Sequence, residues 1–141
     1  MRSVLQNVEE TEQLGAELYV SSPRKYLVFL QGDLGSGKTT LVRGYLRAAG
    51  YAGTVKSPTY NIVEEYTLAG NKIYHFDLYR LNDPEELEYL GISDYFKQDS
   101  VCFIEWPDKG EGFLPKPDAV ITLSVEGNGR VADIQQISGI S

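Results

Sequence analysis

The sequence has little cysteine and no long hydrophobic run. Its 141 residues include one cysteine, so no disulfide can form within the chain, and we expect a reducing compartment. The first ten residues lack the apolar stretch of a signal peptide. The longest unbroken apolar run, residues 26–30, is far shorter than the roughly 20 residues of a membrane-spanning helix. These absences predict a cytoplasmic protein without a membrane anchor.

Basic residues are also few. There are 13 Lys and Arg residues against 20 Asp and Glu residues, which gives a net charge of −7. Neutralisation of phosphates supplies most of the affinity of nucleic-acid-binding proteins, so we do not expect this chain to hold a nucleic acid unaided. Residues 81–111 contain nine acidic and two basic side chains. This segment is either a solvated helical surface or a patch for a basic protein partner.

The remaining composition is typical of a globular protein. Hydrophobic residues make up 42% of the chain, which excludes wholesale disorder. A domain takes roughly 100–200 residues, so the length predicts one domain over residues 1–141.

Local patterns predict both helices and strands. Asn7, with Glu10 three residues later, matches a capping box at the start of a first helix. The predicted helices span residues 7–19, 38–49, 84–90 and 93–96, and the predicted strands span residues 26–30, 61–66, 72–80, 101–105, 119–125 and 131–137. We therefore expect an α/β fold with a mixed β-sheet flanked by helices.

A glycine-rich segment joins the first predicted strand to the second predicted helix. Residues 32–39 read Gly-Asp-Leu-Gly-Ser-Gly-Lys-Thr and match the phosphate-loop pattern Gly-x-x-x-x-Gly-Lys-Ser/Thr. Glycines allow successive backbone N–H groups to point at a bound polyphosphate. Lys38 would reach the β- and γ-phosphates, and the Thr39 hydroxyl would bind Mg²⁺. The alternative is a glycine turn that only joins strand to helix, and the specificity of the pattern favours the phosphate site. The segment predicts a fold of the P-loop NTPase type.

Two predicted strands end on an acidic residue. A phosphate loop needs a carboxylate to hold Mg²⁺ or to orient the attacking water. The apolar strand that ends at Glu105 is typical of the centre of a sheet, so we favour Glu105 for the metal site. Asp77 is the second candidate acid, and the alternative is that its carboxylate only stabilises a turn.

Several other residues leave alternatives open. Ser57, Pro58, Thr59 and Tyr60 form either a switch segment near a γ-phosphate or a plain turn. Trp106 is either part of the core or an aromatic wall of the site. His75, the only histidine, and Cys102 are interpreted as strand residues without a catalytic role.

Five segments of the chain resemble the TsaE family, also called YjeE, of small bacterial ATPases. They are GDLGSGKTT at 32–40, VKSPTYNIVEEY at 55–66, YHFDLYRL at 74–81, DPEELEYLGISDYF at 83–96 and IEWPDKG at 104–110. The resemblance implies a cytoplasmic protein required for threonylcarbamoyladenosine modification of tRNA. It also implies a complex with the TsaB and TsaD proteins, in which TsaD transfers the carbamoyl group and tRNA is held through the partners.

The resemblance further implies roles for individual residues. It implies that ATP is bound by Thr11, Gly35, Ser36, Gly37, Lys38, Thr39, Thr40 and Trp106. It implies that Mg²⁺ is bound by Thr39 and Glu105, and that Asp77, Glu105 and Lys38 serve catalysis. Residues 57–60 would then act as the switch.

Three alternative functions can be compared with this one. A small-molecule kinase normally closes an arginine-bearing lid, and the six arginines here are scattered. A GTPase would carry Asn-Lys-x-Asp, whereas Asn71-Lys72 is followed by Ile-Tyr. A nucleotide-gated binding module with negligible turnover remains open. The sequence does not reveal the oligomeric state.

Overall fold

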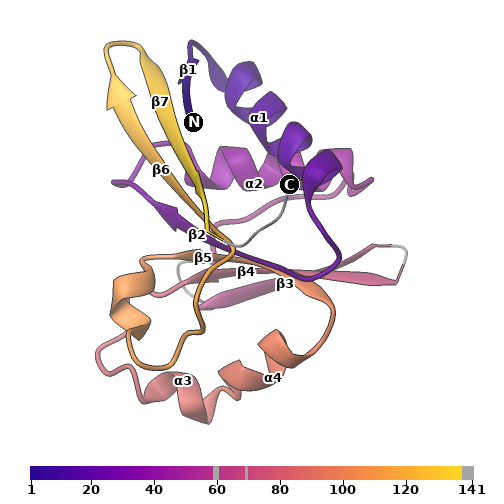
Figure 1. Ribbon diagram of the computed structural model, residues 1–141, viewed down its shortest axis with the longest axis vertical. Helices are drawn as coiled ribbons and strands as arrows, with labels where there is room; N and C mark the ends of the chain where they lie inside the picture. Colours follow the sequence, from indigo (N-terminus) through magenta and orange to yellow (C-terminus); the bar gives the residue numbers. More distant parts are fainter. Residues whose placement is uncertain (59–60, 69, 138–141) are drawn as a thin grey trace.

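The strands come together in one seven-stranded sheet with helices on both faces (Figure 1). The computed structural model describes residues 1–58, 61–68 and 70–137. Its elements, in chain order, are β1 Arg2–Leu5, α1 Val8–Ser21, β2 Tyr26–Gln31, α2 Lys38–Ala48, β3 Val63–Leu68, β4 Asn71–Asp77, α3 Glu86–Tyr89, α4 Ile92–Lys97, β5 Ser100–Glu105, the 3₁₀ turn η1 Pro107–Gly110, β6 Ala119–Glu126 and β7 Gly129–Gln136. The predicted mixed α/β fold is confirmed.

The centre of the sheet is parallel and its edges are antiparallel. The strand order is β1-β7-β6-β2-β5-β4-β3, with β2 parallel to both β5 and β6, and β5 parallel to β4. The carboxyl ends of β2, β5 and β4 therefore meet at one edge. The register of β4 and β5 places Asp77 beside Glu105 at that edge.

Alternating side chains of the central strands build a core on each face of the sheet. On one face Val28, Leu30 and Phe103 pack under α1 and α2, and on the other Phe76 and Ile104 pack against α3 and α4 (Figure 1). Both faces of β5 are buried, as its continuous apolar sequence predicts.

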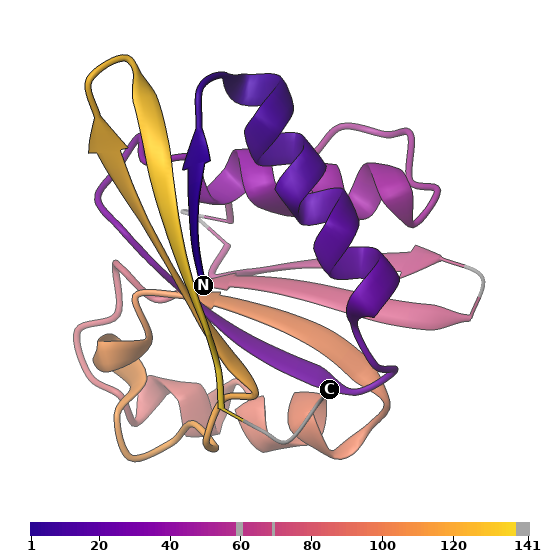
Figure 2. The same ribbon diagram turned by 45° about the horizontal axis from the view of Figure 1, so that its top comes forward.

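The first helix begins where its capping residue predicts. Asn7 Oδ1 accepts a hydrogen bond from the Glu10 N–H at 2.9 Å, and the Glu10 carboxylate accepts one from the Gln6 N–H at 3.0 Å. The helix continues to Ser21, two residues beyond the predicted end. It crosses α2 through Gly15 and Gly44, where an added Cβ would lie about 2 Å from backbone oxygens of the facing helix. Figure 2 shows this crossing.

Other local details also differ from the sequence-based expectations. Strand β1 was not predicted, and it forms the edge of the sheet by pairing with β7 (Figure 2). Strand β3 begins at Val63 rather than residue 61, because Ile62 has a left-handed φ of 67°. Strand β4 ends at Asp77 rather than residue 80, because the Asp77 carboxylate accepts the Tyr79 N–H and turns the chain. The sequence Ala69-Gly70-Asn71 is typical of a hairpin turn, and Ala69 lies outside the described residues.

Two expectations about the whole chain can also be compared with the structure. Within the described ranges, no helix combines the length and the apolar character needed to cross a membrane. Cys102 is a free, buried thiol in the core, as its position in an apolar strand indicated.

Candidate functional site

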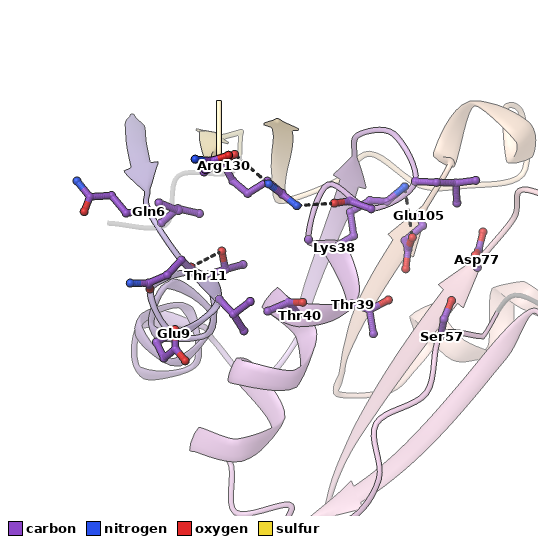
Figure 3. A pocket seen from close by; sticks show the side chains of 18 residues that line it. Gln6, Glu9, Thr11, Lys38, Thr39, Thr40, Ser57, Asp77, Glu105 and Arg130 are labelled. Carbon is purple, nitrogen blue, oxygen red and sulfur yellow. Dashed lines mark hydrogen bonds and ion pairs between the residues drawn. The ribbon is translucent and has the colours of Figure 1, made fainter. Parts of the chain in front are cut away.

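A cavity of about 620 Å³ opens at the carboxyl edge of the sheet (Figure 3). Its walls come from segments far apart in the sequence. The lining residues are Leu5, Gln6, Asn7, Val8, Glu9, Thr11, Leu34, Gly35, Gly37, Lys38, Thr39, Thr40, Ser57, Asp77, Glu105, Asn128, Gly129 and Arg130. The cavity therefore joins the glycine loop to the acidic strand ends at one side and to the start of α1 at the other.

The glycine loop adopts backbone conformations that favour glycine. Gly32, Gly35 and Gly37 have φ angles of 144°, 80° and 107°. At Gly32 a Cβ would also lie 2.4 Å from the Leu123 carbonyl oxygen, so the loop follows β6 closely. Gly37 directly precedes α2 and has no side chain to cap it, which leaves the first N–H groups of α2 available to an anion.

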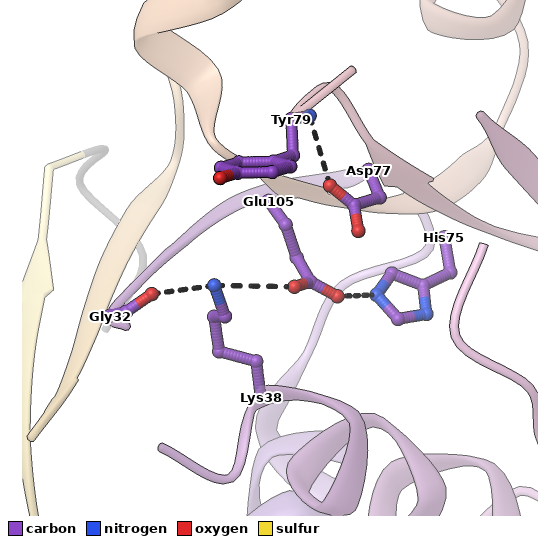
Figure 4. A network of polar contacts seen from close by, with 6 residues as sticks. All are labelled: Gly32, Lys38, His75, Asp77, Tyr79 and Glu105. Carbon is purple, nitrogen blue, oxygen red and sulfur yellow. Dashed lines mark hydrogen bonds and ion pairs between the residues drawn. The ribbon is translucent and has the colours of Figure 1, made fainter. Parts of the chain in front are cut away.

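The Lys38 side chain folds back toward the glycine loop that precedes it in the chain. Its Nζ donates a hydrogen bond to the Gly32 carbonyl oxygen at 2.6 Å and lies 3.4 Å from Glu105 Oε1 (Figure 4). The same Nζ is 4.7 Å from the centroid of the Trp106 ring. The ammonium group is thus buried but surrounded by a carbonyl, a carboxylate and an aromatic face.

Glu105 is a buried carboxylate with two partners. Its Oε2 lies 2.5 Å from His75 Nε2, and its Oε1 faces Lys38 (Figure 4). Burial raises the pKa of Glu105, but the hydrogen bond and charge of His75, followed by the charge of Lys38, outweigh burial and bring the pKa below its ordinary value. Glu105 is therefore ionised and can only accept hydrogen bonds, so His75 Nε2–H is the donor.

Asp77 takes part in a turn and also lines the cavity. Its Oδ1 accepts a hydrogen bond from the Tyr79 N–H at 3.0 Å, which confirms the turn interpretation. The same buried side chain lies at the cavity wall beside Glu105 (Figure 3). The position of Asp77 is compatible with a role as the second acid, and this role stays a prediction.

Trp106 packs between the glycine loop and the core on the side of the sheet that α3 and α4 cover. Its backbone φ is 56°, in the left-handed region, and its ring lies 5.0 Å from that of Tyr79. It covers Lys38 but does not line the cavity itself. Ser36 also lies away from the cavity, because its side chain is buried beneath the loop and finds no hydrogen-bond partner among the described residues.

The other predicted residues surround the cavity. Thr11 is buried in α1, and a Cβ added at Gly37 would lie 3.6 Å from its methyl group. Thr39 and Thr40 occupy the first turn of α2 and line the wall. Ser57 of the predicted switch segment is also at the wall, whereas Thr59 and Tyr60 lie outside the described residues.

Sequence reasoning missed two residues at this site. Arg130 is the second residue of the last hairpin strand, yet its Nη2 donates to the Gly35 carbonyl oxygen at 3.0 Å. Nothing in the local sequence links it to the loop 95 residues earlier. His75 was interpreted as an ordinary strand residue, although its spacing of two from Asp77 places both on one face of β4. The spacing of two between His75 and Asp77 was the one feature of the sequence that could have pointed to His75.

The oxygen-bearing side chains at the sheet edge fit a magnesium ion that arrives with a polyphosphate. Thr39, Asp77 and Glu105 offer a hydroxyl and two carboxylates at one end of the cavity. Across the described part of the chain, no group of three His, Cys, Asp or Glu residues is placed to hold a metal by itself. Mg²⁺ in phosphate-binding sites commonly uses one or two carboxylates and takes its other ligands from phosphates and water.

Comparisons with known proteins agree on one family. Residues 5–132 match the model of "Threonylcarbamoyl adenosine biosynthesis protein TsaE". The TsaE protein of Haemophilus influenzae is 55% identical over 113 residues, covering 80% of this chain and 72% of that protein. The TsaE protein of Bacillus subtilis is 35% identical over 122 residues, covering 86% and 76%.

A solved structure shares the fold. The crystal structure of YdiB from Bacillus subtilis aligns with a TM-score of 0.83 and 27% identity, covering 98% of this chain and 86% of that one. The family match spans residues 5–132, which include the glycine loop, and the structural neighbour covers 98% of the chain. The chain therefore belongs to the TsaE family of threonylcarbamoyl adenosine biosynthesis proteins.

Proposed function

We propose that the chain is a subunit that binds and hydrolyses ATP with Mg²⁺ during threonylcarbamoyladenosine modification of tRNA. One observation supports this above all: Lys38, Glu105 and Asp77 meet at the end of a cavity that the glycine loop also lines. A lysine, two carboxylates and a set of backbone N–H groups are the parts that phosphoryl transfer from a nucleotide requires. The family name places the relatives in the tRNA modification pathway.

The glycine loop and α2 would bind the phosphates. The uncapped N–H groups at the start of α2 and the loop amides suit the α- and β-phosphates. The ammonium of Lys38 would leave the Gly32 carbonyl and pair with the β- and γ-phosphates. Thr39 and Glu105 would hold Mg²⁺, which neutralises phosphate charge when it is bound.

The opposite end of the cavity suits the nucleoside. Thr11 and Gln6 come from the start of α1 and the turn before it, and Arg130 comes from the β6–β7 hairpin (Figure 3). Arg130 already holds the Gly35 carbonyl, so it fixes this side of the loop. This arrangement supports a site for a whole nucleotide rather than for free phosphate.

Hydrolysis would take place beside Glu105 and Asp77. The carboxylate oxygens there can accept hydrogen bonds from a water molecule and orient it toward the γ-phosphate. Among the described residues that line the cavity, Lys38 is the cation next to Glu105, while Arg130 lies at the other end. A single lysine supports slow turnover, and a charge supplied by a partner would raise it.

The partners and the location are part of the same proposal. TsaB and TsaD would activate the chain, and tRNA would be held mainly by them, because this chain carries a net charge of −7. The free, buried thiol of Cys102 is compatible with the reducing cytoplasm.

The test is steady-state ATP hydrolysis by the chain alone and with TsaB, TsaD and tRNA. We expect slow turnover alone and a clear rise in the mixture. Glu105→Gln should reduce the stimulated rate by about 10²-fold or more while ATP still binds. Glu111→Gln, an acid-to-amide change at an exposed position, serves as the matched control and should leave the rate unchanged.

Two results would replace the proposal. Binding of ATP without any rise in turnover would favour a nucleotide-gated assembly module. Transfer of the γ-phosphate to a small-molecule acceptor would favour a kinase.

A further inference from the structure

We infer that His75 is a positioning residue that holds the Glu105 carboxylate in place for ATP hydrolysis, an inference that rests on the function proposed above. The imidazole is completely buried on the face of β4 that also carries Asp77. It touches the site through Glu105 only, among the contacts described.

The geometry assigns a separate partner to each oxygen of Glu105. Oε2 accepts the His75 Nε2–H at 2.5 Å, and Oε1 faces the Lys38 ammonium at 3.4 Å. The first contact joins two strands whose pairing fixes the distance between them. The second involves a flexible lysine that also bonds the Gly32 carbonyl. The histidine contact is thus the rigid one.

This difference matters when a polyphosphate occupies the loop. Lys38 then turns toward the phosphates, and its hold on Oε1 weakens. Glu105 keeps its orientation because Oε2 remains bonded to His75, and Oε1 stays directed into the cavity. Hydrogen bonds of this kind orient a carboxylate at small entropic cost, since the histidine itself is locked by packing.

A purely structural role for His75 explains the site less well. A buried polar ring is unfavourable unless it is hydrogen-bonded, and Nδ1 finds no partner among the described residues. An apolar residue would fill the same core position without leaving a nitrogen unsatisfied. The single hydrogen bond to Glu105 is therefore the property that distinguishes histidine at this position.

The hydrogen bond can be tested without nucleotide. His75 is the only histidine, so ¹⁵N-labelled protein gives one imidazole spin system. We expect a protonated Nε2 whose proton resonates far downfield, and loss of that resonance in Glu105→Gln. A proton on Nδ1 alone would overturn the inference, because Nε2 could then donate nothing to Glu105.

The positioning role is tested by partner-stimulated ATP hydrolysis. His75→Leu should lower kcat by about 10–100-fold with little change in KM, as is found for residues that orient a functional ligand. His75→Gln places an amide N–H near the position of Nε2 and should recover most of the lost rate. In a background of Glu105→Gln, His75→Leu should cause no further loss.

Matched controls separate this role from folding. Ile73→Val changes a buried residue on the same face of β4 and should leave kcat unchanged. If His75→Leu does not fold, His75→Asn replaces it, because the shorter amide cannot reach Oε2. Wild-type rates in His75→Leu or His75→Asn, or equal loss in His75→Gln, would overturn the inference. Absence of ATP hydrolysis by the wild-type complex would instead overturn the proposed function, while the NMR experiment still tests the hydrogen bond.

Discussion

Lys38, His75 and Glu105 are polar residues in a place where apolar ones would pack at least as well. Each is nearly or completely buried, and the desolvation of a buried ion pair can exceed the attraction between its charges. Removing one member leaves an uncompensated charge, which costs about 3–5 kcal/mol in buried pairs. Their presence at the cavity wall is therefore explained by the chemistry of the site rather than by stability.

Cys102 lies outside the site, and burial changes the pKa of its thiol. Burial raises the pKa of its thiol to about 11, with the Ser100 hydrogen bond opposing this effect. The thiolate is the reactive form, so we expect almost no reaction with Ellman's reagent at pH 8 in the folded protein. The thiol should react at once in guanidinium chloride.

The raised pKa of the Cys102 thiol also makes the stability of the fold depend on pH. The proton is held more tightly in the folded state, so this contribution is full below about pH 9 and is lost as pH rises toward 11. Fast reaction of the native protein at pH 8 would contradict the buried position of Cys102.

At the scale of elements, the crossing of α1 and α2 decides how the cavity is closed. Gly15 and Gly44 allow the two backbones to touch, and this contact places Thr11 beside the glycine loop. The Glu12–Arg43 ion pair, at 3.1 Å, lies at the same crossing and is only half-buried. Close backbone contact, rather than charge, therefore sets the position of α1.

We expect Gly44→Ala to destabilise the protein and to weaken nucleotide binding. Its Cβ would lie 2.0 Å from the Glu12 carbonyl oxygen, so α1 must move away from α2. Overpacking of this kind costs about 1–3 kcal/mol, measurable by urea unfolding.

Gly50→Ala is the control for this prediction. Gly50 follows α2, and an added Cβ there meets nothing within 4 Å. Its φ of 102° makes alanine unfavourable by about 1 kcal/mol, but ATP affinity should not change. Equal affinity of the Gly44→Ala variant and the wild type would show that α1 does not contribute to the nucleotide site.

At the scale of the molecule, the cavity joins the start, the middle and the end of the chain. A ligand that contacts all these segments binds the folded state and not the unfolded one. We expect ATP with Mg²⁺ at about a hundredfold excess over Kd to add roughly 3 kcal/mol of stability. For a domain of this size the melting temperature should rise by roughly 5–15 °C.

Two lysine variants make this prediction specific. Lys38→Met should reduce the ATP-induced rise sharply, because it removes the cation that faces the phosphates. Lys25→Met, at an exposed position before β2, should keep the full rise. A rise that is equal in both variants would mean that ATP binds elsewhere.

Much of the fold could be predicted because its signals are local. The Asn7 cap, the apolar runs of β2 and β5, and the glycine-lysine-threonine sequence before α2 each depend on residues within a few positions of one another. Strand β1 could not be predicted, since four residues with exposed Val4 acquire strand structure only by pairing with β7.

The glycine loop, the acids at the strand ends and the family could be recognised from the sequence, because these features depend on spacing along the chain. The contacts of His75 with Glu105, of Arg130 with Gly35 and of Trp106 with Lys38 could be found in the folded protein alone. The first two contacts join residues 30 and 95 positions apart, and strand order and register, which bring such residues together, are set by the packing of the whole sheet.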